Sequence, residues 1–422
     1  MIPSINPLVL NLKESATLLI NNTVKEMRAQ GRDVAHFGFG QAAFPVPELL
    51  VNALRDNAGE NSYLPTQGLL PLREAFCEYM RSEFGLNYTP GDVFVGPGSK
   101  ELIFQISYMV EGVLLAPAPS WVSYGPQATL RGKKLIPIET QRENSYKLTA
   151  RELDQCCHSL AQEQKLLILN NPGNPTGSVY SADELREIAD ICRAYNVLVI
   201  SDEIYAKIDF TGRPHASIST YYPEGTIVST GLSKSFAAGG YRVGMMVIPE
   251  TLGVLKDALK SVISETFSAV SAPMQYAALA AYSRFDELKD EINLNTEIYK
   301  SASRYLWSRF LEMDLNCPKP QGAFYLFPDF ENFRPQLRKK GILTGIQLSH
   351  SVLEEKGVGF LPGSDFYFPA TNLGIRVCSV DFNGKAVRDK WPGGKLTDTQ
   401  IHELFPNLVM GCDRMEAYLR DL

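Results

Sequence analysis

The chain has 422 residues, of which 45% are hydrophobic and 21% charged, and its 47 acidic and 41 basic residues give a formal net charge of −6. This composition is ordinary for a folded globular protein, and the length suggests two or three domains. Because the charges form no long blocks of one sign, nothing indicates a nucleic-acid partner or an anionic membrane surface. We therefore expect a small-molecule partner.

The cysteines and the N-terminus predict the cellular compartment of the protein. The seven cysteines are scattered, with one adjacent pair, Cys156 and Cys157, and no CxxC spacing. That pattern is typical of free thiols in a reducing compartment. The N-terminus lacks the pattern of a signal peptide, and no apolar run approaches the roughly 20 residues that span a bilayer. We expect a soluble, cytoplasmic protein without membrane contact.

The first predicted elements are a helical run that ends near Arg32 and a Gly/Pro-rich link up to residue 47. Residues 92–95 then form an apolar strand, and "GPGSKELIFQISYMV" is a glycine turn that opens a helix. Another apolar strand, residues 113–116, precedes "PAPSW". Both strands end in turn-forming sequence.

The clearest pattern lies between residues 164 and 205. An apolar strand over 166–169 is stopped by "NNPGNPTG", and a second strand over 197–200 runs into Ser201-Asp202-Glu203. Between them, "SADELREIADICRAYN" has capping-box spacing and one apolar helical face. A strand, helix and strand in this order imply parallel pairing.

A further strand over 227–229 leads into "STGLSKSFAAGGYRVG". Several strands thus end in polar or glycine-rich sequence at their carboxyl ends, which is where open parallel sheets bind ligands. The fold class is α/β. We expect a large domain over 48–305, with a mostly parallel sheet sandwiched by helices.

The remaining segments predict a smaller α+β domain built from both termini, residues 1–47 and 306–422. From residue 306 onward, helical and strand-like segments alternate, including "AFYLFPDF" and "LGIRVCSVDF". The charged stretch "NGKAVRDKWPGGKL" at 383–396 is most simply a surface loop. No internal repeat is present.

The lysine in "STGLSKSF" is the first candidate for chemistry. Lys234 follows a predicted buried strand, among residues small enough for a ligand to approach. A phosphate-binding P-loop would need glycine directly before the lysine and another five residues earlier, where this chain has Ser233 and Val228. An amine in a cleft shifts its pKa readily and forms Schiff bases with carbonyls. Lysines of that kind most often serve pyridoxal phosphate.

Pyridoxal phosphate needs partners that neighbouring strand ends supply. Asp202 offers a carboxylate for the ring nitrogen, and Tyr205 and Asn174 offer donors for the phenolic oxygen. Backbone N–H groups at Ser99 and Lys100, where a helix begins, suit the phosphate. A flat cover for one ring face is available in Trp121.

Four motifs resemble those of one family. The segments "NNPGNPTG", "SDEIYA", "SKSFAAGGYRVG" and "LGIRV" stand in the order of the class I/II aminotransferases, pyridoxal-phosphate enzymes of fold type I. The likeness covers nearly the whole chain. "SATLLI" and "SYLPTQGLLPLR" also resemble the bacterial branch of aspartate and aromatic aminotransferases.

The resemblance implies a role for each matching position. Lys234 is the Schiff-base lysine and the acid/base that moves the Cα proton; Asp202 pairs with the pyridinium, and Tyr205 and Asn174 bind its phenolic oxygen. The phosphate is bound by Arg242, Ser233, Gly98 and Ser99. The substrate side holds Arg376, which grips the α-carboxylate as a two-pronged fork, with Gly40, Trp121 and Asn174. Tyr63 matches a tyrosine that reaches the neighbouring subunit's phosphate, which implies a homodimer with shared active sites.

Each assignment also has a structural interpretation: Asp202 as a cap, Asn174 as part of a turn, Trp121 as core, Tyr63 as a surface aromatic, and Arg242 and Arg376 as exposed arginines. The histidines have neither metal-ligand spacing nor triad partners, so we expect no metal site.

The implied reaction is a ping-pong transamination between an amino acid and a 2-oxo acid, with 2-oxoglutarate as the expected acceptor. A lyase or an aminocyclopropane-carboxylate-synthase-like enzyme would keep every cofactor residue, and a non-catalytic binding protein is the third possibility. The donor stays open among aspartate, aromatic and alanine-type amino acids. Thr17 resembles a position near the distal carboxylate of dicarboxylic substrates, yet "LIFQISYMV" offers no basic residue to neutralise one.

Overall fold

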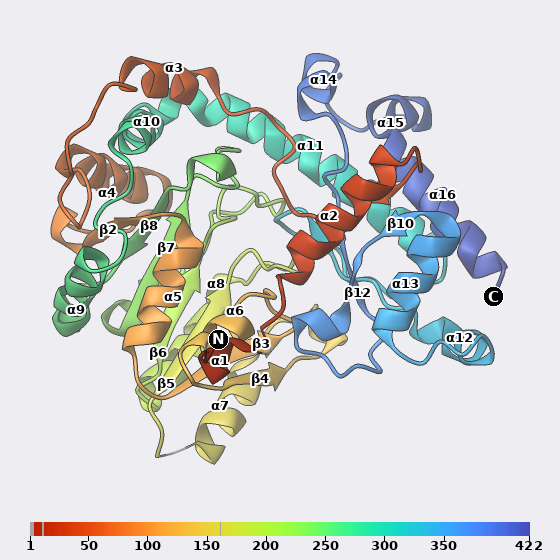
Figure 1. The fold of residues 1–422 in the computed structure, drawn as a ribbon, viewed down its shortest axis with the longest axis horizontal. Coiled ribbons are helices and arrows are strands. Elements are labelled where there is room, and N and C mark those ends of the chain that lie inside the picture. Colours follow the sequence, from red (N-terminus) through yellow and green to blue (C-terminus); the bar gives the residue numbers. More distant parts are fainter. Residues whose placement is uncertain (1–3, 11, 161) are drawn as a thin grey trace.

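The computed structural model of the chain describes residues 4–10, 12–160 and 162–422. The helices are α1 Pro7–Leu10, α2 Ala16–Ala29, α3 Glu48–Asp56, α4 Leu70–Phe84, α5 Ser99–Met109, α6 Tyr124–Leu130, α7 Ala150–Ser159, α8 Ala182–Ala194, α9 Gly253–Ser264, α10 Ala272–Ser283, α11 Phe285–Glu312, α12 Arg334–Lys339, α13 Gly345–Lys356, α14 Gly384–Asp389, α15 Asp398–Leu404 and α16 Pro406–Arg420 (Figure 1). The strands are β1 Ala35–His36, β2 Val93–Gly96, β3 Val113–Ala118, β4 Leu135–Glu139, β5 Lys165–Asn170, β6 Leu198–Asp202, β7 Thr226–Gly231, β8 Gly244–Val247, β9 Tyr325–Leu326, β10 Val358–Gly359, β11 Leu361–Pro362 and β12 Ile375–Cys378.

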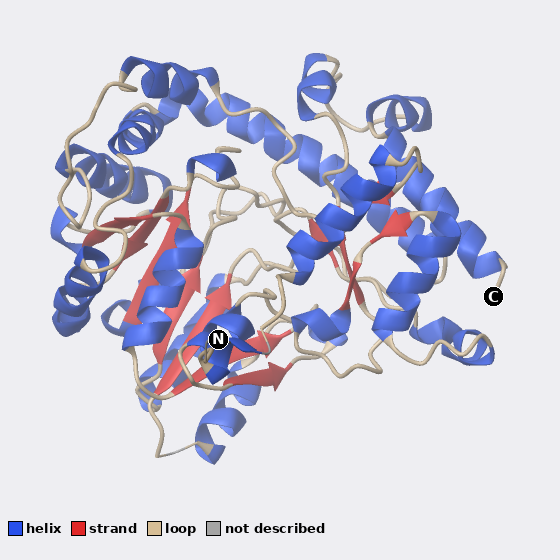
Figure 2. Cartoon of the chain, viewed as in Figure 1, coloured by secondary structure: helices blue, strands red, loops and turns tan. Residues whose placement is uncertain are grey.

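A seven-stranded sheet in the order β2-β8-β7-β6-β5-β3-β4 forms the centre of the larger part (Figure 2). The strands from β7 to β4 pair in parallel, and β8 is antiparallel to both of its neighbours. The predicted α/β class with a mostly parallel sheet is therefore confirmed. The register sets Asn170 opposite Asp202 and Asp202 opposite Ser229, so the polar ends of β5, β6 and β7 lie level at one edge.

The alternating direction of side chains along β5 explains why helices cover both faces of the sheet. Leu166 and Ile168 of β5 join a core that includes α5 and α9, whereas Leu167 and Leu169 join a core with α7 and α8 on the opposite face. Successive side chains of a strand point to opposite faces, so a strand with no polar break needs helices on both. All six residues of β5 are buried accordingly.

The helix predicted between β5 and β6 is α8, and its start follows the predicted capping box. The Ser181 side chain accepts a hydrogen bond from the Glu184 N–H, and the Glu184 carboxylate accepts one from the Ser181 N–H. These two bonds satisfy N–H groups that have no partner inside the helix. The apolar face predicted from the sequence is buried, with Leu185, Ile188 and Cys192 among its residues.

The smaller part combines both ends of the chain. Strand β1 pairs in parallel with β10, and β11, β12 and β9 form an antiparallel sheet. This pairing supports our proposal that residues 1–47 and 306–422 form one domain beside the large domain over 48–305. The long helix α11 continues through residue 305, so the proposed boundary falls within a helix that connects the two parts (Figure 1).

The stretch 383–396 differs from the loop predicted for it, because it begins with α14. The Asn383 side chain accepts a hydrogen bond from the Ala386 N–H, which caps the first turn, and Val387 is buried. The cap satisfies an N–H group that has no partner inside the helix, and Val387 packs into the core of the smaller part. Residues 390–396 that follow contain no helix or strand.

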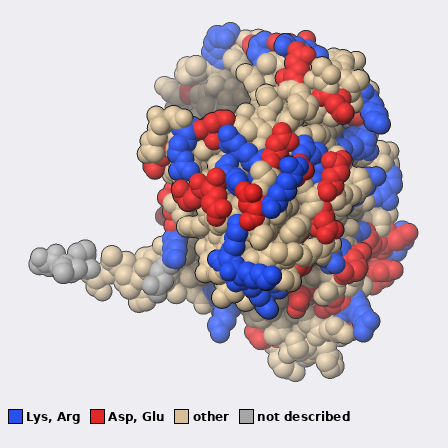
Figure 3. Space-filling view, turned by 90° about the vertical axis from the view of Figure 1, so that its right-hand side faces the viewer, with Lys and Arg blue, Asp and Glu red and all other residues tan. Residues whose placement is uncertain are grey.

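Two properties of the surface follow from the described residues. Within 4–10, 12–160 and 162–422, no helix is both long and apolar enough to cross a membrane. On the face drawn in Figure 3, basic and acidic side chains are intermixed and do not separate into large patches of one sign.

Candidate active site

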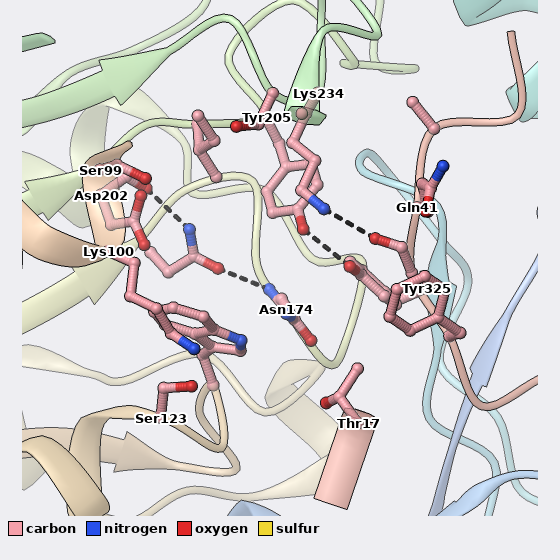
Figure 4. Close-up of a pocket in the computed structure, with 18 of the residues that line it drawn as sticks. Thr17, Gln41, Ser99, Lys100, Ser123, Asn174, Asp202, Tyr205, Lys234 and Tyr325 are labelled. Carbon is pink, nitrogen blue, oxygen red and sulfur yellow. Dashed lines mark hydrogen bonds between the residues drawn. The ribbon is translucent and has the colours of Figure 1, made fainter. Parts of the chain in front are cut away.

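A cavity of about 470 Å³ lies at the carboxyl ends of β5, β6 and β7. Most of the predicted site residues line it: Gly40, Ser99, Lys100, Trp121, Asn174, Asp202, Tyr205, Ser233, Lys234, Arg242 and Arg376. Figure 4 shows Lys100 and Asp202 on one side of this space and Gln41 and Tyr325 on the other. Two predicted residues, Gly98 and Tyr63, are outside the lining.

Lys234 enters the cavity from the turn after β7. Its Nζ donates a hydrogen bond of 2.7 Å to the main-chain oxygen of Gly40 (Figure 4) and lies 5.8 Å from the ring centre of Tyr205. Burial lowers the pKa of the amine to about 8, and the positive charges of Arg376 and Arg242 act in the same direction. A substantial fraction of this amine is therefore neutral near physiological pH, as a nucleophile or base requires.

Asp202 ends β6 and is buried. The hydroxyl of Tyr124, which is not among the predicted site residues, donates a 2.7 Å hydrogen bond to Oδ2. The other oxygen, Oδ1, is buried without a partner among the described residues. Burial raises the pKa of this carboxyl to about 6, although the bond from Tyr124 opposes the rise. An acceptor left free inside a cavity is suited to an N–H donor on a bound ligand.

Two asparagines, one at the end of β5 and one in the turn that follows, fix the backbone beside this carboxylate. Asn170, which the sequence did not single out, donates from Nδ2 to the Asp202 main-chain oxygen at 2.7 Å. Its Oδ1 accepts a 2.7 Å bond from the Asn174 N–H. The only sequence signal for Asn170 is its place as the first residue of the predicted turn "NNPGNPTG". Asn174 is buried and lines the cavity, so it is more than part of a surface turn.

Tyr205 is also buried, and its hydroxyl lies 2.7 Å from that of Tyr325. Tyr325 comes from β9, 120 residues further along the chain, and also lines the cavity. Tyr325 was not among the predicted site residues, because "AFYLFPDF" has only the pattern of an apolar strand.

The N-terminus of α5 and Arg242 form a concave, donor-rich corner of the cavity. Gly98 has φ of 89°, which favours glycine, and precedes Ser99, the first residue of α5. Arg242 donates to the main-chain oxygens of Gly239 and Pro97, at 3.0 and 3.2 Å. A Cβ on Gly98 would overlap the Arg242 guanidinium. Gly98 therefore permits a helix N-terminus and an arginine to converge, which suits a phosphate.

Arg376 in β12 is only 1% exposed. Its Nη2 donates to the Gly38 main-chain oxygen at 2.6 Å, and its Nη1 makes a long, 3.4 Å bond to Asn174 Oδ1. The guanidinium lies 5.1 Å from the ring centres of both Tyr325 and Phe366, while its Nε has no partner among the described residues. A buried guanidinium without a carboxylate partner is prepared for an anionic ligand.

Lys100 contributes a second cation. We expected its backbone at a phosphate site, and its side chain also reaches the cavity, with Nζ 5.2 Å from the Trp121 ring centre. Burial and the charge of Arg242 lower its pKa. Thr17 and Ser123 line the same space. Lys100 is thus a basic residue of this cavity, two positions before "LIFQISYMV".

Tyr63 lies apart from the cavity, in the loop between α3 and α4. It is 97% exposed. Within one chain it has no part in the site, and its predicted role in a neighbouring subunit stays a prediction.

The arrangement fits pyridoxal phosphate. Lys234 supplies the amine for the aldehyde, the unpartnered Oδ1 of Asp202 suits the ring N–H, and the corner formed by Gly98, Ser99 and Arg242 suits the phosphate.

Comparison with known proteins agrees with this interpretation. The chain is 34% identical to the aspartate aminotransferase of Geobacillus stearothermophilus over 370 residues, which are 86% of this chain and 91% of that protein. It is 33% identical to the probable N-acetyl-LL-diaminopimelate aminotransferase of Bacillus subtilis, over 86% of this chain and 88% of that one. The structure of Thermus thermophilus aspartate aminotransferase with maleate matches with a TM-score of 0.85 at 26% identity, covering 99% of this chain and 100% of that one.

An amine, a buried carboxylate and two arginines around one cavity at the edge of a parallel sheet define a transaminase that uses pyridoxal phosphate. The match to a family model narrows this class. The chain belongs to the aminotransferase class I and II family, whose model matches residues 32–382.

Proposed function

We propose that this transaminase takes its amino group from a dicarboxylic amino acid, with aspartate as the first candidate. The proposal rests on the observation that, besides Lys234 and Arg242, which we assign to the cofactor, the cationic side chains of Arg376 and Lys100 line the same cavity. Arg376 offers a buried, rigid fork for the α-carboxylate, and Lys100 offers a point charge for a second carboxylate. Relatives named as aspartate aminotransferases support this donor.

Pyridoxal phosphate, when bound, supplies an electrophilic carbon and a sink for the electrons released at the substrate's Cα. The protein's part begins with orientation. In the proposal, Arg376 replaces its weak bond to Asn174 with bonds to the substrate carboxylate and so turns the Cα–H bond towards Lys234. Holding two reacting groups in fixed geometry is a large part of such catalysis.

Lys234 then acts as the base. Its amine takes the Cα proton on Nζ and later returns one, and a pKa of about 8 suits both directions. The hydrogen bond to the Gly40 oxygen keeps Nζ within the cavity when the amine is not otherwise engaged.

Asp202 supplies the fixed negative charge of the site. Its Oδ1 would accept the ring N–H of the bound cofactor, and Tyr205 and Asn174, which line the same cavity, would bind the phenolic oxygen. Burial strengthens such charge interactions because water does not screen them.

The proposal includes a homodimer and a cytoplasmic location. A fully exposed Tyr63 in a loop beside α4 is available to a second copy of the chain, where it would contact the phosphate site. The location is supported by the cysteines, all seven of which are free thiols.

A panel of amino donors tested with 2-oxoglutarate as acceptor decides the substrate. We expect aspartate to give the highest kcat/KM, with glutamate as product, and expect turnover to stop when the acceptor is omitted. Continued turnover without acceptor, with release of ammonia or a split side chain, would identify a lyase. A higher kcat/KM for alanine or an aromatic donor would reject the dicarboxylic assignment.

A further inference from the structure

Asp202 is held by a hydrogen bond from Tyr124, a residue without a role in the proposed reaction. Tyr124, the first residue of α6, lies 78 positions before Asp202 in the chain and donates to its Oδ2 at 2.7 Å. Both residues are buried. This bond occupies one carboxylate oxygen and leaves Oδ1 free, so it also determines which oxygen remains for a ligand.

Tyr124 is fixed in turn by the residues around it. Its ring meets that of Trp121 edge-on, with centres 5.3 Å apart. The Tyr367 hydroxyl donates to the Trp121 main-chain oxygen at 2.7 Å and accepts from the Gly125 N–H at 2.8 Å. One phenol thus closes both ends of the turn that carries Trp121 and Tyr124.

Tyr367 has an unusual backbone for this task. Its φ is 76°, in the left-handed region that residues with a side chain rarely adopt. Its neighbour Phe366 accepts a 3.3 Å bond from the Ser120 N–H. A Cβ on Gly125 would approach the Tyr367 ring to 2.8 Å, so the contact depends on glycine there. Several features are therefore arranged to bring this phenol to the turn.

We propose that Tyr124 is a positioning residue that orients Asp202 and stabilises its ionised form, and that Tyr367 holds Tyr124 in place from the C-terminal part of the chain. Tyr367 bonds the segment that contains Tyr124, and Tyr124 bonds Asp202, so residues 366–367 are linked to the carboxylate through two successive contacts. The Tyr367 hydroxyl also bonds the main-chain oxygen of Trp121, so Tyr367 positions the Trp121 ring that lines the cavity. This inference rests on the proposed role of Asp202 as the partner of the ring nitrogen.

The electrostatic part of the proposal can be separated from packing by pH. The ionisable groups that face Asp202 are Tyr124 on α6, Glu203 next to it, Lys234 after β7, and the buried phenols Tyr205 and Tyr325. Burial raises the pKa of Asp202, so the folded chain binds a proton there more readily than the unfolded chain. The ionised carboxylate therefore costs stability once the pH rises through about 6, and Tyr124 reduces that cost.

The test uses the apoprotein and three variants, Tyr124→Phe, Tyr367→Phe and the control Tyr418→Phe. Tyr418 is a buried phenol of α16 whose hydroxyl bonds Ser351 at 2.7 Å, far along the chain from Asp202. Melting temperatures are measured at pH 5 and pH 8, and pyridoxal phosphate affinity at pH 8. For Tyr124→Phe we expect the loss in Tm to be larger at pH 8 than at pH 5 by roughly 2 °C. Its cofactor affinity should fall about tenfold or more.

Tyr367→Phe should change both quantities in the same direction but less, and Tyr418→Phe should lose equal stability at the two pH values with unchanged cofactor affinity. Parallel pH behaviour of Tyr124→Phe and the wild type would overturn the proposal for Tyr124. A normal Tyr367→Phe beside an affected Tyr124→Phe would overturn the part played by Tyr367. Failure of the unmodified protein to bind pyridoxal phosphate would instead reject the proposed function, so the two failures are distinguishable.

Discussion

The Nζ of Lys234 lies 2.7 Å from the main-chain oxygen of Gly40, a residue 194 positions earlier. The bond joins the turn after β7 to the link that follows β1. It holds the amine inside the cavity, beside the ring of Tyr205, and gives it an acceptor that a substrate-bound state can replace.

Replacing Lys234 tests the centre of the chemistry. Lys234→Ala should lower transamination by roughly 10⁴-fold or more, because both the nucleophile and the base are lost. Absorbance of the bound cofactor and steady-state turnover measure the effect, and added methylamine should restore part of the rate. Lys319→Ala is a matched control, since Lys319 also lies over an aromatic ring, at 5.5 Å from the centre of Trp307. A Lys234→Ala enzyme with near-normal turnover would contradict the mechanism.

Arg376→Lys tests the carboxylate fork. A lysine keeps the charge but cannot bond the Gly38 oxygen and a carboxylate with the same planar group, so kcat/KM should fall about 100-fold, chiefly through KM. Cofactor affinity, measured by titration of the apoprotein, should stay within about twofold. The control is Arg309→Lys, which alters a salt-bridged arginine of α11. Equal losses in cofactor and substrate binding would show that Arg376 is structural.

Lys100→Met tests the choice of donor. Methionine keeps the apolar stem over Trp121 and removes the charge, so kcat/KM for aspartate should fall about tenfold, while that for alanine should change little. The ratio of the two, measured with 2-oxoglutarate in excess, is the informative quantity. Lys133→Met removes a lysine that is paired with Glu111 outside this cavity and serves as the control. An unchanged ratio would remove Lys100 from substrate selection.

The rate at which the apoprotein captures pyridoxal phosphate should rise with pH through about 8, the lowered pKa of Lys234, because only the neutral amine attacks an aldehyde. Stopped-flow absorbance at a series of pH values measures it. The same lowered pKa predicts how the stability of the fold depends on pH. Between pH 8 and 10.5 the Lys234 amine is protonated in the unfolded chain and neutral in the folded chain. Raising the pH in that interval therefore stabilises the fold at this site. A capture rate that is flat from pH 6 to 10 would argue against a buried neutral amine.

Tyr63→Phe tests the shared site. Since Tyr63 is 97% exposed, loss of its hydroxyl should leave the stability of the chain unchanged. If the residue contacts the neighbouring phosphate, cofactor affinity should fall about tenfold while the protein still sediments as a dimer. Sedimentation of the unmodified protein as a monomer, with full activity, would remove this role.

Much of the large part of the fold was predictable because its signals are local. The apolar run at 166–169, the capping box at Ser181 and Glu184, and the strand ending at Asp202 each identify an element from a few adjacent residues. Parallel pairing then brings the ends of these strands to one edge. That is why Asp202, Asn174 and Lys234 could be expected in one cavity before any coordinates were known.

Other features depended on contacts that leave no local pattern. Asn383 capping α14 was hidden in a charged stretch that reads as a loop. Tyr325 reads as an ordinary strand residue, yet its hydroxyl meets that of Tyr205 across 120 positions. Lys100 was expected to contribute only its backbone, and the direction of its side chain was not encoded in its neighbours.

The sequence by itself determined the strand, helix and strand between residues 164 and 205, the α/β class and the residue types needed for an aldehyde cofactor, because periodicity, capping and turn residues act over a few positions. Only the tertiary structure decided how each group is held: Tyr124 on one oxygen of Asp202, Gly40 on the amine of Lys234, and two aromatic rings around Arg376. These contacts join distant segments. Burial shifts the pKa values of Lys234 and Asp202, and these side chains are buried only in the folded chain.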